Sequence, residues 1–187
     1  MRKIAVFASG SGSNAENIIK YFRNRSIEAE FIILTNSTKA YVIERAKQLD
    51  VPCYTFNRKD FYDNDRVLGL LSEHHIDFVV LAGFLLLVPE SLINAYEGMI
   101  VNIHPALLPK YGGKGMYGMN VHQAVVDNHE KETGITIHQV NSKYDEGNVI
   151  FQAKCEVNPS DSADDVAQKI HKLEYEHFPK VIETILK

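Results

Sequence analysis

The feature that most constrains the fold is a regular alternation of short apolar segments with amphipathic segments of helical length. Phe78–Ala82 is apolar throughout, as is typical of a strand buried on both faces of a parallel sheet. We expect strands at Lys3–Ala8, Phe31–Thr35, Cys53–Phe56, Phe78–Ala82, Met99–Ile103, Thr133–Val140 and Val149–Val157. We expect helices at Asn14–Asn24, Tyr41–Leu49, Phe61–Glu73, Pro89–Ala95 and Val121–Asn128, and a last helix after Ser162. This order predicts an α/β fold with an open, mostly parallel twisted sheet of about seven strands and helices on both faces.

The last helix has a clear start signal, because Ser162 can cap it and Asp165 follows three residues later. Pro179 should kink this helix or divide it in two. The chain of 187 residues shows no repeat, low-complexity tract or linker, so we expect one domain, 1–187.

Charge and composition narrow the class of protein. A net charge of -4 without any basic run argues against nucleic-acid binding. The apolar stretch that ends before Ser9 is too short for a signal peptide or a membrane span, so we expect a cytoplasmic protein with no membrane partner. Cys53 and Cys155 lack C-x-x-C spacing and lie in apolar segments, which favours buried thiols over a disulfide or a zinc site.

One apolar strand ends in residues capable of chemistry. Met99–Ile103 alternates as a strand does, and Pro105 ends the strand because proline has no backbone N–H to donate. Asn102 and His104 are two residues apart, so an extended backbone projects their side chains from one face. Open α/β sheets bind ligands at the carboxyl ends of their strands. The alternative is a strand end whose polar residues have no chemical role.

A glycine-rich turn, Ser9–Asn14, follows the first expected strand. Its glycines permit a sharp turn, and the N–H groups that open the next helix lie at the positive end of the helix dipole. Gly10–Ala15 also matches the dinucleotide motif G-x-G-x-x-A, but the second strand ends in Thr35 and Asn36 instead of the acidic residue that binds ribose. We therefore favour a single phosphate over a dinucleotide. A turn that binds nothing, with Asn14 as the helix cap, is the other alternative.

The turn Lys143–Asn148 carries Asp145 two residues before a glycine, a pattern that often marks only a tight turn. If this turn folds against the end of Met99–Ile103, the carboxylate would face His104, fix the tautomer of its ring and raise its pKa. Asn102, His104 and Asp145 would then be a donor, an acid–base group and the residue that orients it.

Other histidines suggest no metal site. His122, His129 and His138 lack partners at metal-ligand spacing, and no H-E-x-x-H motif occurs. His171 and Glu174 share a helical face at i and i+3, where they could bind a metal, pair on the surface or contact a substrate.

Two further segments follow strands at the expected ligand-binding edge. Leu85–Val88 comes after an apolar strand and could line a cleft for a flat ring, or simply belong to the core. Tyr111–Asn120 holds four glycines, which predicts a mobile loop beside the site.

These segments together resemble the folate-dependent phosphoribosylglycinamide formyltransferases of purine biosynthesis. The resemblance is collinear from Ile4 to about Phe178 and rests on IAVFASGSGSN, VVLAGF, NIHPALLPKYGG, and TGITIH through YDEGNVIFQA. Asn-x-His-Pro followed by Asp-x-Gly is specific to the wider formyl-transfer family, and the GSGSN turn selects the glycinamide ribonucleotide branch.

The resemblance implies that the amine of glycinamide ribonucleotide attacks the formyl carbon of 10-formyltetrahydrofolate directly, without a metal. It implies that Asn102 donates to the oxyanion, that protonated His104 stabilises it and helps to move protons, and that Asp145 raises the pKa of the imidazole. The implied phosphate-binding residues are Gly12, Ser13 and Asn14, and the implied glycinamide and ribose contacts are Glu174, Pro105 and His171. The implied folate contacts are Leu85, Leu86, Leu87, Val88, Asn102, Asn141, Ser142, Lys143, Tyr144 and Asp145.

Three alternatives share the same motif. A methionyl-tRNA formyltransferase would carry an additional C-terminal domain, and a formyltetrahydrofolate hydrolase an N-terminal regulatory domain, for which this length leaves no room. A ligand-binding sensor that kept the fold without turnover would not need all of Asn102, His104 and Asp145. We expect the two small-molecule substrates as partners and a monomer or homodimer.

Overall fold

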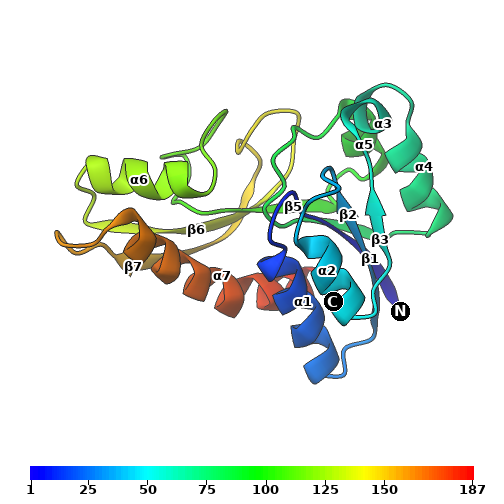
Figure 1. The fold of residues 1–187 in the computed structure, drawn as a ribbon, viewed down its shortest axis with the longest axis horizontal. Coiled ribbons are helices and arrows are strands. Elements are labelled where there is room, and N and C mark those ends of the chain that lie inside the picture. The colour runs from blue at the N-terminus through cyan, green and yellow to red at the C-terminus, as the bar shows by residue number, and fades with distance from the viewer. The chain divides into compact units, whose positions relative to one another are not determined.

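Strands and helices alternate along the chain, as the sequence predicts (Figure 1). The computed structural model describes residues 1–187. In chain order the elements are β1 (Arg2–Phe7), α1 (Ser13–Asn24), β2 (Ala29–Thr35), α2 (Val42–Gln48), β3 (Cys53–Thr55), α3 (Arg58–Tyr62), α4 (Arg66–Glu73), β4 (Phe78–Leu81), α5 (Glu90–Ala95), β5 (Ile100–His104), α6 (Met119–Asp127), β6 (Glu132–Gln139), β7 (Val149–Glu156) and α7 (Ala163–Leu186). The strand order is β3-β2-β1-β4-β5-β6-β7, which confirms the open, mostly parallel α/β sheet.

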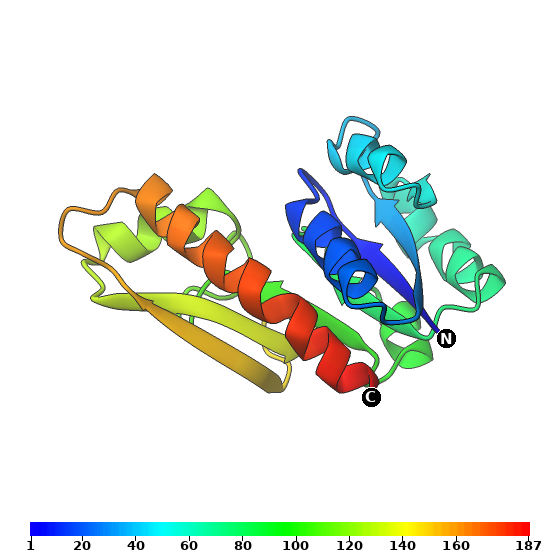
Figure 2. The ribbon, with the colours of Figure 1, turned by 90° about the horizontal axis from the view of Figure 1, so that it is seen from below.

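The first of two compact units, Met1–Val101, is built on parallel strands. β1 lies between β2 and β4, and Ile4 pairs with Phe31 on one side and with Phe78 on the other. Residues Ile4–Phe7 and all of β4 are buried, because helices cover both faces of a parallel sheet. α1 and α2 contact each other and β2, and Figure 2 shows α1 and α4 on opposite sides of these strands.

The second unit, Asn102–Lys187, contains the antiparallel hairpin of β6 and β7. A Cβ on Gly134 would lie 1.9 Å from the carbonyl oxygen of Ala153, so this position has no room for a side chain. α7 packs against both strands and against α6, and Figure 2 shows it running along the hairpin. The single domain expected for 1–187 stays a prediction.

The single helix predicted over Phe61–Glu73 is wrong, because α3 and α4 occupy this region as two shorter helices. α3 begins early, since the Asn57 side chain accepts from the Asp60 N–H (3.0 Å) and the Asp60 carboxylate accepts from the Asn57 N–H (3.1 Å). Asp65 then takes a left-handed conformation with φ 50°, which separates the two helices.

The cap predicted at Ser162 is confirmed, because its hydroxyl accepts from the Asp165 N–H at 3.2 Å and its N–H donates to the Asp165 carboxylate at 2.9 Å. Pro179 lies within α7 without dividing it. Cys53 and Cys155 are free, but they are half-buried instead of buried, since β3 and β7 are the outermost strands of the sheet order. None of the helices combines the length and the apolar character needed to cross a membrane.

Candidate active site

The end of β5 and the turn between β6 and β7 bring Asn102, His104 and Asp145 together. One carboxylate oxygen of Asp145 lies 3.5 Å from Nδ1 of His104, and the other lies 3.5 Å from Nδ2 of Asn102. Asp145 reaches this position in a left-handed conformation, with φ 56°. The side chains of His104 and Asp145 are 4% and 12% exposed, so little water screens their interaction.

His138 on β6 belongs to the same cluster, although its spacing in the sequence predicted no partner. The pairing of β6 with β7 shifts register at this point, because Ile137 pairs with Phe151 and His138 with Val149. Nδ1 of His138 lies 2.7 Å from the carbonyl oxygen of Gln139, so Nδ1 carries a proton and Nε2 of the neutral ring is an acceptor. Nδ2 of Asn102 lies 3.1 Å from that Nε2, which sets the orientation of the Asn102 amide.

The amide of Asn102 therefore has one N–H engaged by His138. The second N–H lies near Asp145 at 3.5 Å, which is too long for a strong hydrogen bond. This weakly engaged N–H is therefore available to a stronger acceptor, such as an oxyanion.

Both ring nitrogens of His104 face acceptors. Nε2 lies 2.7 Å from the carbonyl oxygen of Tyr111, so Nε2 carries a proton and the nitrogen that titrates is Nδ1, beside Asp145. Burial lowers the pKa of His104 below its ordinary value, and neither Asp145 nor the Tyr111 carbonyl, which both raise it, offsets that effect. This corrects the expectation that Asp145 raises the imidazole pKa overall: the carboxylate acts in the predicted direction, but loss of water outweighs it.

Asp145 is held as a carboxylate by the donors around it. Burial raises its pKa, but His138, whose Nε2 lies 3.6 Å from Oδ1, the charge of His104 and the N–H of Gly113 lower it to a net value below the ordinary one. The Gly113 N–H lies 3.0 Å from Oδ2. Tyr111 and Gly113 belong to the glycine-rich segment predicted beside the site, and the structure places both against the cluster.

Gly12, Ser13 and Asn14 lie in the first unit, where β1 leads into α1. Gly12 precedes the helix with φ 72°, and no side chain caps this end of α1. Since α1 begins at Ser13, Asn14 lies inside the helix, and the alternative in which Asn14 is the cap does not hold. The backbone N–H groups of this first turn have no partner within the helix, as anion binding at a helix start requires.

The other residues implied for the acceptor substrate differ in exposure. Glu174 on α7 is buried, whereas His171, one turn earlier, is exposed and stacks on Tyr175 with ring centroids 6.1 Å apart. His171 and Glu174, predicted to share one face of the helix, therefore differ: Glu174 is buried in the protein and His171 is exposed to solvent. Pro105 is half-buried directly after His104. The chain contains no group of three or more His, Cys, Asp or Glu side chains positioned to hold a metal ion.

The residues implied for the folate lie on two segments. Leu85–Val88 follows β4 in the first unit, and its first N–H donates to the hydroxyl of Ser9 at 3.0 Å. Asn141–Asp145, in the second unit, is a largely exposed turn in which the Asn141 side chain accepts from the Lys143 N–H at 2.9 Å.

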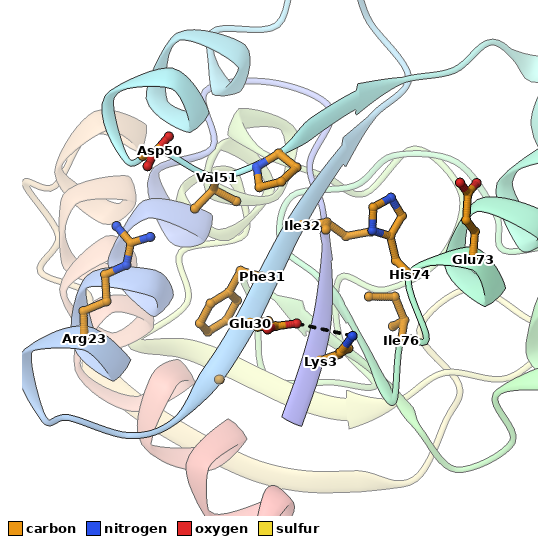
Figure 3. Close-up of a pocket in the computed structure, with 12 residues that line it drawn as sticks. Lys3, Arg23, Glu30, Phe31, Ile32, Asp50, Val51, Glu73, His74 and Ile76 are labelled. Atoms are coloured by element: carbon orange, nitrogen blue, oxygen red, sulfur yellow. Dashed lines mark ion pairs between the residues drawn. The ribbon is translucent and has the colours of Figure 1, made fainter. Parts of the chain in front are cut away.

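A pocket of about 430 Å³ opens in the first unit at the amino ends of the strands (Figure 3). Its lining comes from the starts of β1 and β2 and from the residues that precede β3 and β4, including Lys3, Glu30, Pro52 and His74. Lys3 and Glu30, which are paired residues on β1 and β2, form an ion pair at 3.4 Å (Figure 3). Because open α/β sheets bind their ligands at the carboxyl ends of the strands, we do not assign the site to this pocket.

Comparison with known proteins gives a consistent result over the whole chain. The sequence profile of the family described as "Formyl transferase" matches residues 2–182. Phosphoribosylglycinamide formyltransferase of Bacillus subtilis is 35% identical over 100% of this chain and 95% of that protein. The chloroplastic phosphoribosylglycinamide formyltransferase of Arabidopsis thaliana is 35% identical over 98% of this chain, which spans 65% of that longer protein. The crystal structure of phosphoribosylglycinamide formyltransferase from Streptococcus pneumoniae covers 100% of both chains with a TM-score of 0.87 and 38% identity. The chain therefore belongs to the formyl transferase family.

Proposed function

We propose that the protein transfers the formyl group of 10-formyltetrahydrofolate to the amine of 5-phosphoribosylglycinamide, a step of de novo purine biosynthesis. The observation that carries this proposal is the cluster of buried His104 with half-buried Asn102 and Asp145, in a chain whose full-length relatives are named for this transfer. Formyl-folate is the co-substrate, and no metal takes part.

In the proposed reaction the amine nitrogen attacks the formyl carbon, and the formyl oxygen becomes an oxyanion. Asn102 donates its second amide N–H to this oxygen, and His138 holds the amide in place. Collapse of the intermediate breaks the bond between the formyl carbon and N10 of the folate. The amine loses a proton and N10 gains one, which leaves tetrahydrofolate and the formylated ribonucleotide.

His104 stabilises the oxyanion through the charge of its imidazolium form, since both ring nitrogens face acceptors of the protein, and Asp145 supports this charged form from the Nδ1 side. Because burial lowers the pKa of His104, the imidazolium releases its proton more readily than a histidine in water. This favours a role in moving the proton between the amine and N10.

The binding roles follow the same assignment. Gly12, Ser13 and Asn14 bind the phosphate of the acceptor, and Glu174, His171 and Pro105 contact its glycinamide and ribose portions. The folate binds to Leu85–Val88, Asn102 and Asn141–Asp145. We propose a cytoplasmic monomer or homodimer of one domain, with no nucleic-acid or membrane partner.

The test is an assay of the purified protein with 10-formyltetrahydrofolate and one acceptor at a time, with Asn102→Ala as the inactive control. Formylation of glycinamide ribonucleotide supports the proposal. Transfer to initiator tRNA, release of formate without an acceptor, or folate binding without turnover would each replace it with one of the alternatives above.

A further inference from the structure

Arg45, on α2, contacts the turn that leads into α1, yet the reaction proposed above gives it no role. Its Nε donates to the carbonyl oxygen of Ser11 at 2.9 Å. Three residues earlier on the same helix, the N–H of Val42 donates to the carbonyl oxygen of Gly10 at 3.1 Å. Two consecutive carbonyl groups of the turn are therefore held by α2.

The guanidinium of Arg45 is itself fixed in place. It forms an ion pair with Glu16 in the first turn of α1, and it lies over the ring of Tyr41 at 5.1 Å from the centroid. The Arg45 and Glu16 side chains are only 25% and 18% exposed. Glu16 also pairs with Lys20, and the hydrogen bond from Nε is what ties Arg45 to the turn.

Held carbonyls set the direction of the N–H groups that follow them. In a trans peptide the C=O of one residue and the N–H of the next point in opposite directions. With the Gly10 and Ser11 carbonyls turned toward α2, the N–H groups of Ser11 and Gly12 point away from it. Successive N–H groups on one side of a turn form a concave site for an anion.

Packing at Gly12 keeps the turn close to α2. A Cβ on Gly12 would lie 2.2 Å from Cγ2 of Val42, and its φ of 72° is also unfavourable for other residues. The turn thus contacts α2 at three successive residues, Gly10, Ser11 and Gly12. Ser11 is the one whose carbonyl accepts a hydrogen bond from a side chain of α2.

We propose that Arg45 is a positioning residue that presets this turn for a phosphate monoester, by holding the Ser11 carbonyl so that the Ser11–Gly12 peptide directs its N–H at the ligand. The inference rests on the proposed function, in which this turn binds the phosphate of the acceptor substrate. It adds a residue outside the turn whose loss weakens phosphate binding without touching the chemistry.

The test compares Arg45→Met, which keeps the length of the side chain but has no donor, with the wild-type enzyme. We expect the KM for glycinamide ribonucleotide and the Ki of ribose 5-phosphate to rise by up to about tenfold, as loss of one hydrogen bond predicts. The kcat and the KM for 10-formyltetrahydrofolate should stay within about twofold, because the residues assigned to them are unchanged. Arg45→Lys keeps the positive charge near Glu16 but lacks the planar guanidinium with its several donors. It should therefore recover only part of the affinity for ribose 5-phosphate.

Arg23→Met is the matched control. Arg23 also donates to a backbone carbonyl, that of Leu49 at 2.6 Å, but at the other end of α1 from the turn. This variant should leave the Ki of ribose 5-phosphate unchanged.

Equal Ki values of ribose 5-phosphate for the wild type and Arg45→Met would overturn the role of Arg45 and leave the proposed function standing. If Arg45→Met does not fold, equal Ki values for the wild type and Arg45→Lys would have the same meaning. A wild-type protein that formylates glycinamide ribonucleotide but is not inhibited by ribose 5-phosphate would also overturn it. A wild-type protein that neither binds ribose 5-phosphate nor formylates the ribonucleotide would contradict the proposed function as well.

Discussion

Asn102 can offer an N–H to a substrate because His138 holds the other one. Asn102→Ala removes this donor, so we expect kcat to fall about 10²–10³-fold while substrate affinity changes little. Steady-state kinetics with both substrates measures this. A loss confined to KM would contradict the oxyanion role. His138→Ala keeps the donor but frees the amide to rotate, so its loss of kcat should be smaller.

Asp145 and the Nδ1 side of His104 form a second pair that can be tested alone. Asp145→Asn removes the charge that opposes the effect of burial, so the pKa of His104 should fall further below its ordinary value. Nitrogen-detected NMR titration follows Nδ1 and Nε2 separately. Nε2, which faces the Tyr111 carbonyl, should remain protonated throughout. An unchanged titration would mean that the two side chains do not interact.

The β6–β7 hairpin depends on one glycine. Gly134→Ala places a Cβ against the carbonyl of Ala153, so we expect a destabilisation of about 3 kcal/mol, at the upper end of what overpacking costs. Gly69→Ala is the control, because Gly69 lies in α4 with nothing near its missing Cβ. It should stabilise the protein by about 0.5–1 kcal/mol through helix propensity. Urea denaturation compares the two, and equal stabilities would contradict the close approach.

Elements whose residues carry their own pattern were predictable, and those that depend on partners were not. The buried strands are continuous apolar runs, and the Ser162 cap is a local signal, so both were predicted. The break between α3 and α4 was missed although four polar residues, 63–66, interrupt the apolar spacing there, and the break itself depends on the left-handed backbone of Asp65. The register shift at His138 depends on how β6 and β7 pair, which one strand cannot reveal.

The same distinction applies to the site. Asn102 and His104 were predicted from their spacing on one strand. Asp145 was predicted as a conditional partner, since its contact joins segments far apart in the chain. His138 was missed because its role comes from its contacts with Asn102 and Asp145, and a histidine in an apolar strand was the only signal in the sequence. The sign of the His104 pKa shift needed the burial, which only the folded chain defines.

The stability of the whole molecule should depend on pH through His122. Its side chain is buried, its Nδ1 has no hydrogen-bond partner, and burial, with the nearby His171 and His104, lowers its pKa from 6.5 to about 4. The folded state therefore keeps His122 neutral, whereas the unfolded chain takes up a proton below pH 6.5. Stability should fall as pH drops from 6.5 toward 4, by up to roughly 3 kcal/mol from this residue.

Urea denaturation of His122→Leu across this range tests the contribution. The variant should lose less stability between neutral and acidic pH than the wild type does. His129→Asn removes an exposed histidine and should keep the wild-type dependence. Parallel curves for His122→Leu and the wild type would show that His122 takes up its proton as readily in the folded protein as in the unfolded chain.

The hairpin that carries His138 and Asp145 also has a consequence for how the molecule assembles. These two residues are brought together by a short turn between neighbouring strands, whereas His104 and Asn102 reach them from much earlier in the chain. Contacts between nearby residues close faster than contacts across long loops, because less chain entropy is lost. We expect β6 and β7 to gain protection in pulsed hydrogen exchange before β5 does. His138 and Asp145 would then be in place before β5 brings His104 to them.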